Sequence, residues 1–445
     1  MLDKFFGTAA KLSFTTLIAV GSMLSVGSFA QDNEYVEEVV SIGTRGKPRS
    51  VSSSPVPVDV LSAEDISKTG TDDLLMQLQG SIPSLNVHLQ PISDAASMIR
   101  PANLRGLSAD STLITTNGKR RHHASVIAFQ GGGVNDGSQG ADISVIPAIA
   151  LKRVEVLRDG ASAQYGSDAI AGVINFVLDD ISEGGSLSYK MGEYTEGDGA
   201  TSTIAGKYGM PLGQDGFVTT SFQIRQADDT SRSAQRPDAA ALIAAGNTAV
   251  ANPAQIWGAP KIDDDVTFFM NAGVTNSDGS ESYMFGNYSE RDVDGGFYYR
   301  NPDGRSGVFT IGDYRAVGNV DGTCAYGTGA SGQVDPSNYV VRDAIMADPS
   351  CFLMNEIAPG GYTPRFVGTI TDTSFTTGRR GEITDGFLSG YSYDVSGSVG
   401  RNEADFGLNN TVNPSMGPDT PRNFITGSYI ELEKTFNFDL QKQFD

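Results

Sequence analysis

The chain has 445 residues, and its composition excludes several classes of protein. Lys plus Arg number 32 and Asp plus Glu number 53, so the formal net charge is −21 and a phosphate-tracking nucleic-acid surface is excluded. Two Cys and three His are too few for a disulfide-dense scaffold or a Cys/His zinc module. No apolar run long enough for a membrane-spanning helix follows residue 30. Any further contact with a bilayer is therefore expected to use β-strands.

Residues 1–30 have the pattern of a secretory signal peptide. Basic residues precede a largely apolar stretch at 12–26, and small residues at 28 and 30 occupy the −3 and −1 positions of a cleavage site after residue 30. The apolar stretch is too short, and too often broken by Ser, Thr and Gly, for a membrane anchor. The mature chain is thus expected outside the cytoplasm, where thiols oxidise, and Cys324 and Cys351 are predicted to form a disulfide.

From about 55 to 180 the pattern is mixed α/β, and it predicts a small compact domain. A short strand is predicted at 57–61. A helix is predicted at 62–78, opened by Ser62 and Asp65 at a spacing related to the capping box. The later strands of this domain are predicted at 154–157 and 169–177.

From residue 181 onward the pattern changes, because apolar and polar residues alternate with period two between turn residues. The connections are alternately short and long, which is typical of a transmembrane β-barrel with turns in the periplasm and loops outside. A soluble β-sandwich also alternates but gives no reason for the one-sided loop lengths. The predicted strands are 185–192, 201–210, 217–227, 265–275, 281–291, 374–383, 391–408 and 426–443.

The number of strands bears on the size of the whole barrel. A barrel of eight strands has its interior filled by its own side chains, so it could not hold a domain such as 55–180. A plugged barrel of about 22 strands would need on the order of 730 residues at the spacing seen here. We therefore expect 181–445 to be the N-terminal part of a truncated antiparallel transmembrane β-barrel.

Several segments between residues 37 and 178 resemble the plug domain of TonB-dependent outer-membrane receptors. The most specific is 151–160, Leu-Lys-Arg-Val-Glu-Val-Leu-Arg-Asp-Gly, which continues to Ala-Gly-Val-Ile-Asn at 171–175. Asp159 departs from the family, which usually has Pro at this position. The resemblance covers the whole plug, and it covers the barrel by pattern alone. Shorter matches are Leu-Arg-Gly at 104–106, Thr-Asn-Gly-Lys-Arg at 116–120 and Ile-Pro at 146–147.

The resemblance implies a bacterial outer-membrane importer of a scarce ligand, in this family usually a ferric chelate and sometimes cobalamin or a glycan. A plug domain at 55–180 would follow a coupling box and flexible linker at 31–54. The coupling box reads as a strand with no sheet of its own, which the C-terminal domain of TonB would bind by β-augmentation in the periplasm. The alternative is a passive outer-membrane barrel or adhesin without energy coupling, which has no use for such a segment. The coupling-box residues are Glu37, Glu38, Val39, Val40, Ser41 and Ile42.

A group of basic residues in this otherwise acidic chain is a candidate ligand contact. The residues fall in or beside two polar connections, 88–100 and 121–142, which are expected to face out of the cell. Charge-assisted hydrogen bonds from them would suit an anionic ligand, and pairing with acidic residues of the barrel wall is an equal alternative. The ligand-binding candidates are Arg100, Arg120, Arg121, His122 and His123.

Other charged residues in the plug motifs are expected to be structural. Arg105, Glu155 and Arg158 are predicted to form salt bridges between plug and barrel inside a polar lumen. The chain has no G-x-S-x-G motif, and its histidines lack Cys or Glu partners at metal-ligand spacing. We therefore expect no enzyme activity, no resident metal and no cofactor.

Overall fold

The computed structural model describes residues 39–40, 42, 49–50, 57–71, 73–87, 97–100, 102–128, 133–327 and 332–442. The predicted signal peptide and the coupling-box residues Glu37, Glu38 and Ser41 lie outside the described residues. Within these ranges, every helix is too short or too polar to span a bilayer.

The first part of the described chain is an α/β domain built on a five-stranded sheet with the order β3-β8-β9-β6-β7. Strands β6 and β9 are parallel, and the other neighbours are antiparallel. A second pair, β4 and β5, lies outside this sheet. The strands are β3 (Val58–Ser62), β4 (Leu85–Val87), β5 (Ala102–Leu104), β6 (Thr112–Thr116), β7 (Lys119–Arg120), β8 (Leu151–Leu157) and β9 (Gly172–Leu178). The helices are α1 (Ala63–Ser67), α2 (Leu74–Ser81) and α3 (Ser162–Tyr165).

The single helix predicted at 62–78 is two helices, α1 and α2. The predicted start is confirmed, since the Ser62 hydroxyl accepts a hydrogen bond from the Asp65 backbone N–H at 3.1 Å. Helix α2 has its own N-cap, because the Asp73 carboxylate accepts hydrogen bonds from two backbone N–H groups of its first turn. Gly70 between the helices favours the break, since glycine is a poor helix former.

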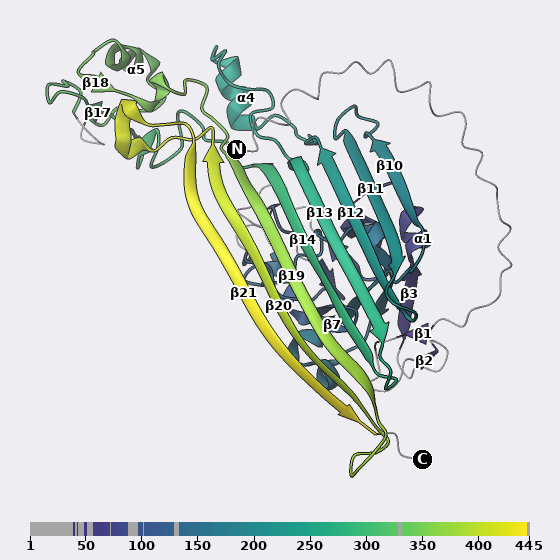
Figure 1. Ribbon diagram of the computed structural model, residues 1–445. Coiled ribbons are helices and arrows are strands. Elements are labelled where there is room, and N and C mark those ends of the chain that lie inside the picture. The colour runs from purple at the N-terminus through teal and green to yellow at the C-terminus, as the bar shows by residue number, and fades with distance from the viewer. Residues whose placement is uncertain are drawn as a thin grey trace. The chain divides into compact units, whose positions relative to one another are not determined.

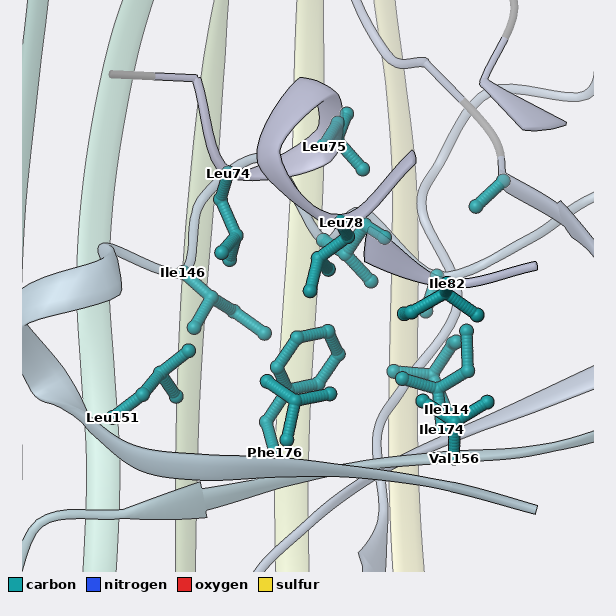
Figure 2. Close-up of a cluster of buried hydrophobic side chains, with 14 of the residues drawn as sticks. Leu74, Leu75, Leu78, Ile82, Ile114, Ile146, Leu151, Val156, Ile174 and Phe176 are labelled. Carbon is teal, nitrogen blue, oxygen red and sulfur yellow. The ribbon is translucent and has the colours of Figure 1, made fainter. Parts of the chain in front are cut away.

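The core of the α/β domain lies between α2 and the five-stranded sheet. Figure 2 shows Leu74 and Leu78 of α2 directed toward Phe176 of β9. Leu78 and Phe176 are fully buried. Gly172 at the start of β9 allows two strands to approach closely, because a Cβ atom there would lie 2.2 Å from the Leu157 carbonyl oxygen. Its φ of +148° also favours glycine.

The rest of the described chain contains an eight-stranded antiparallel sheet with the order β10-β11-β12-β13-β14-β19-β20-β21, and Figure 1 shows these strands side by side. All eight predicted strands are confirmed. Short turns join β11 to β12, β13 to β14 and β19 to β20, and longer loops make the other connections after β12, β14 and β20. The strands are β10 (Gly185–Gly192), β11 (Thr201–Pro211), β12 (Gly216–Ala227), β13 (Lys261–Thr275), β14 (Glu281–Gly296), β19 (Arg365–Ile383), β20 (Tyr391–Asn409) and β21 (Phe424–Gln441).

Three strands extend further toward the long loops than the alternating pattern predicts. Strand β13 begins at Lys261, β14 ends at Gly296, and β19 begins at Arg365, which pairs with Gly296. The extensions are rich in charged residues and glycine. Backbone pairing does not require apolar side chains, so hydropathy alternation underestimates strand length where a sheet leaves the apolar zone.

The two faces of the eight-stranded sheet differ in character. On β13, Val266 and Phe268 are about half exposed, whereas Thr267 and Phe269, which alternate with them, are buried. Phe268 pairs with Phe222 on one neighbour and with an aromatic residue of β14 on the other. One face thus carries the exposed apolar band that suits lipid, and the other packs against the α/β domain.

The long loop after β14 contains small elements and a disulfide. A disulfide joins Cys324 to Cys351. Cys351 begins β18 and lies in an apolar cluster with Ile345 and Leu353. The elements of this loop are β15 (Thr310–Ile311), β16 (Tyr314–Arg315), β17 (Gly318–Asn319), α5 (Tyr339–Met346) and β18 (Cys351–Phe352). The loop between β12 and β13 contains α4 (Pro237–Ala244).

The sequence predicts that the coupling segment is a strand without a partner. In the structure its described part has one. Val39 pairs with Ser50, and Val40 with Arg49, as the two-residue strands β1 (Val39–Val40) and β2 (Arg49–Ser50). Closing so short a loop costs little conformational entropy, which explains why the segment finds a partner nearby. Ile42 is buried in an apolar cluster of the α/β domain.

Candidate functional site

A buried polar network joins the α/β domain to the inner face of the eight-stranded sheet at Asp372 of β19. The carboxylate of Asp372 accepts a hydrogen bond from Arg121 Nη2 at 2.6 Å, and its second oxygen lies 2.9 Å from His122 Nε2. Asn287 and Asn402, from the strands on either side, donate to the same carboxylate at 2.8 Å and 3.0 Å. Asp372 is 1% exposed, so every contact made by its carboxylate is shielded from water.

Further polar contacts extend this interface along the sheet. His123 Nδ1 lies 2.5 Å from a carboxylate oxygen of Glu433 on β21. Lys119 Nζ lies 2.9 Å from a carboxylate oxygen of Asp394 on β20. The Ser125 backbone N–H donates to the side chain of Asn402 at 2.8 Å. The segment from β7 onward is therefore fixed to four neighbouring strands, β14, β19, β20 and β21, by charged and polar groups.

A second polar group adjoins this network through Asp142, whose carbonyl oxygen accepts a hydrogen bond from Arg121 Nε at 3.3 Å. Arg291 of β14 donates to the Met98 carbonyl oxygen at 2.8 Å and lies 3.5 Å from Asp142. Nearby, Arg100 forms an ion pair with Asp73. Burial raises the pKa of the Asp73 carboxyl, but the charges of Arg100 and Arg225 outweigh burial and hold that pKa below its usual value.

The predicted ligand-binding residues all have acidic neighbours in the structure. Arg121, His122 and His123 contact acids of the eight-stranded sheet, which corresponds to the second of the two alternatives. Arg100 and Arg120 instead pair within the α/β domain, Arg100 with Asp73 and Arg120 with Asp168. None of these positive charges is therefore left without an acidic partner.

The prediction that Arg105, Glu155 and Arg158 form salt bridges with the barrel is wrong. Their ion pairs are with residues of the α/β domain itself. Arg158 of β8 pairs with Asp59 of the adjacent strand β3. The strand register explains this pairing. Asp59 lies opposite Val156, so Arg158, two residues further along the chain, is its diagonal neighbour. Two further pairs complete this set, Arg153 with Glu155 at 2.7 Å and Arg105 with Asp159 at 3.7 Å.

Cavity sizes distinguish the interface from the loops. The pocket beside Lys119, Arg120 and His122 has a volume of about 20 Å³, which is room for about one water molecule. A cavity of about 380 Å³ lies among the long loops, and its lining includes Tyr339 and Arg342 of α5. Of these two, only the loop cavity has the volume typical of a small-molecule site.

The described residues contain no group of three or more His, Cys, Asp or Glu side chains placed to hold a metal ion. Histidines 122 and 123, the adjacent pair in the sequence, point to different carboxylates on different strands. Each imidazole thus contacts a carboxylate of the eight-stranded sheet.

Sequence reasoning missed the partners of the basic residues. Asp372 lies just outside the strand predicted at 374–383, and Asn287, Asn402 and Glu433 lie inside predicted strands without having been singled out. A usable signal exists, since alternation places all four on the inward face, where a polar residue needs a partner.

Comparisons with known proteins agree with this architecture. A family model described as "TonB-dependent Receptor Plug Domain" matches residues 50–173. An "Iron-regulated outer membrane virulence protein" of Vibrio cholerae is 29% identical over 177 residues, covering 40% of this chain and 24% of that protein. A "Ferric enterobactin receptor PirA" of Pseudomonas aeruginosa is 29% identical over 175 residues, covering 37% and 23%. The match thus spans about a quarter of the length of these curated relatives.

Solved structures of outer-membrane siderophore receptors superpose on this chain at low sequence identity. A mutant of the ferric enterobactin receptor PfeA from Pseudomonas aeruginosa superposes with a TM-score of 0.49 and 16% identity, covering 86% of this chain and 45% of that chain. The siderophore receptor PirA from Acinetobacter baumannii gives a TM-score of 0.48 and 16% identity, covering 86% and 44%.

Proposed function

The chain belongs to the TonB-dependent outer-membrane receptors, and we propose on this premise that it serves the energy-coupled import of a ferric-siderophore-type chelate across the bacterial outer membrane. The domain at 55–180 would be the plug, 181–445 part of the transmembrane barrel, 1–30 the signal peptide and 31–54 the coupling box with its linker. No catalytic activity is proposed.

The buried network at Asp372 is the observation that carries the proposal. A plug fixed to the wall by charged pairs closes the path through the barrel, and removing one partner of such a pair costs about 3–5 kcal/mol. A passive pore gains nothing from a plug held in this way. An importer needs both a seal and an external source of work that displaces the seal.

The proposed ligand class is suggested by the relatives. Two of them are named as ferric enterobactin receptors and one as an iron-regulated protein. A ferric chelate brings its own ligands for the metal, so the transporter needs none, and it binds by its shape and surface charge. Ferric enterobactin is therefore the first probe to use, with cobalamin and a glycan as the alternatives.

The proposed partner is the C-terminal domain of TonB, which would bind the segment at 37–42 as an added strand. Val39→Pro removes a backbone donor and fixes φ, so it should disrupt such pairing without touching the plug core. We expect iron-limited cells with this variant to bind ferric enterobactin at the surface with unchanged affinity and to take up no radiolabelled iron.

The β1–β2 pair supplies a matched control for this experiment. Ser50 lies opposite Val39, so Ser50→Pro perturbs the same pair from the strand that is not part of the proposed coupling box. Uptake should survive Ser50→Pro and fail in Val39→Pro. Wild-type uptake by Val39→Pro would favour the passive barrel or adhesin, and loss of surface binding would place Val39 in the fold.

A further inference from the structure

Three arginines of the long loops lack the carboxylate partners that most other arginines of this protein have. Arg315, in the loop between β14 and β19, lies for example 3.0 Å from a carboxylate oxygen of Asp303. Arg300, Arg305 and Arg422 form no ion pair with any residue that the structure describes. In a chain of net charge −21, three unneutralised guanidinium groups are unexpected.

The three arginines converge on Tyr362, which lies in the connection before β19. Arg300 and Tyr362 form an antiparallel bridge with N–O distances of 2.7 Å and 3.2 Å, so their side chains leave the backbone on the same side. The Arg422 guanidinium lies 5.5 Å from the centre of the Tyr362 ring. The Arg305 backbone N–H donates to the Asn301 carbonyl at 3.0 Å, in a turn that returns the chain toward Arg300.

The electrostatic effects within this cluster agree with its geometry. Burial raises the pKa of the Tyr362 hydroxyl, and Arg300, Arg422 and Arg305 all act on that pKa in the opposite direction. Burial and the charge of Arg305 lower the pKa of the Arg300 guanidinium. These directions agree with the contacts of Arg300 and Arg422 with Tyr362, and the charges of Arg300 and Arg305 repel each other.

Other contacts hold the cluster in place without neutralising it. The Arg300 guanidinium lies 5.3 Å from the centre of the Phe297 ring, and Arg422 donates to the neutral side-chain oxygen of Asn410. Arg422 Nε is buried and has no hydrogen-bond partner, which leaves a donor unsatisfied. Arg305 is exposed, so an ion can approach the cluster from solvent.

We propose that Arg300, Arg305 and Arg422 form an anion-binding site at Tyr362 for a multiply charged oxyanion group. Phosphate, carboxylate and catecholate groups all match the planar fork of donors that a guanidinium presents. A bound anion would also relieve the repulsion within the cluster. The inference rests on the proposed function only for the source of the anion, which we take to be the imported chelate. A phosphate group of outer-leaflet lipopolysaccharide could bind through the same contacts, and the test below distinguishes the two sources.

The test uses purified full-length protein in detergent micelles and inorganic pyrophosphate as the probe, titrated by calorimetry at low salt. Arg305→Gln and Arg422→Gln should each weaken pyrophosphate binding about tenfold or more, as loss of a charged hydrogen bond implies. Arg422→Lys should retain part of the affinity. Arg401→Gln is the matched control, because Arg401 is paired with Glu403 and lies outside the cluster.

Two results would overturn the site: no pyrophosphate binding by the wild-type protein, or equal affinity in the wild type, Arg305→Gln and Arg422→Gln. Because Arg305 is exposed, its variant should fold, and heat-modifiable gel mobility checks that both variants do. Displacement of pyrophosphate by a ferric complex of dihydroxybenzoate supports the chelate as the source, whereas displacement only by lipopolysaccharide-containing vesicles overturns that assignment. If pyrophosphate binds as predicted but cells take up no iron, the proposed function fails and the anion site stands.

Discussion

Replacing Asp372 tests whether the plug is held to the wall by its buried network. Asp372→Leu removes the acceptor of Arg121 and of two asparagines and leaves a residue of similar size. The imidazole of His122 can be neutral, but Arg121 cannot lose its charge and its side chain is 2% exposed. The substitution therefore leaves a buried guanidinium without a counterion.

The expected magnitude follows from this burial. Removing one partner of a buried pair costs about 3–5 kcal/mol, so Asp372→Leu and Arg121→Met should each reduce the local stability of plug docking by roughly that amount. The double variant removes both charges together and should cost clearly less than the sum of the two singles, by at least about 2 kcal/mol. Arg380, paired with Glu281 near the surface, is the control, and Arg380→Met should cost less than about 1 kcal/mol.

Hydrogen exchange of the backbone amides in 119–125, followed by mass spectrometry on the folded protein, measures the free energy of opening at the docked segment. Faster exchange should be confined to this segment and its contacts on the sheet, because the apolar cluster around α2 includes neither Asp372 nor any residue of 119–125. The reasoning would be refuted if each single variant changed the opening free energy by less than about 1 kcal/mol, or if the singles simply added in the double variant.

Three further outcomes are expected. Gly400→Ala should destabilise docking by about 1–3 kcal/mol in the same exchange experiment, because its Cβ would lie 2.2 Å from His122 Nδ1; Gly397→Ala on the same strand, with open space around it, should be neutral. The ion pair of Asp73 with Arg100 lowers the carboxyl pKa, so it should stabilise the plug above the unfolded pKa of about 3.9 and lose that contribution as pH falls. In urea denaturation the free energy of unfolding should therefore decrease below about pH 4, and Arg100→Ala should abolish or reverse this trend. Reduction of the loop disulfide, whose cysteines are 27 residues apart, should destabilise the loop by about 3–4 kcal/mol in the chain-entropy model, visible as faster proteolysis there and not in the plug.

The sequence determined the architecture largely through local patterns. Period-two alternation depends on side chains a few residues apart, so it located all eight strands of the sheet and the sides on which turns and loops lie. It failed at strand ends such as Arg365, where pairing continues opposite the aspartates and glycines that end β14. The helix break at Gly70 was missed because the capping signal at Ser62 gave a start without a stop.

Only the tertiary structure decided which charges neutralise one another. A sequence shows that Arg121 is positive but not that its counterion is Asp372, 251 residues away, because that pairing depends on how a domain packs against a sheet. For this reason the sequence left open whether the basic residues meet a ligand or acidic residues, and the structure supplies acidic partners for all five. Arg300, Arg305 and Arg422 remained without acidic partners for the same reason. Two separate loops meet at Tyr362, and Asp303, which lies between Arg300 and Arg305 in the chain, pairs with Arg315 instead.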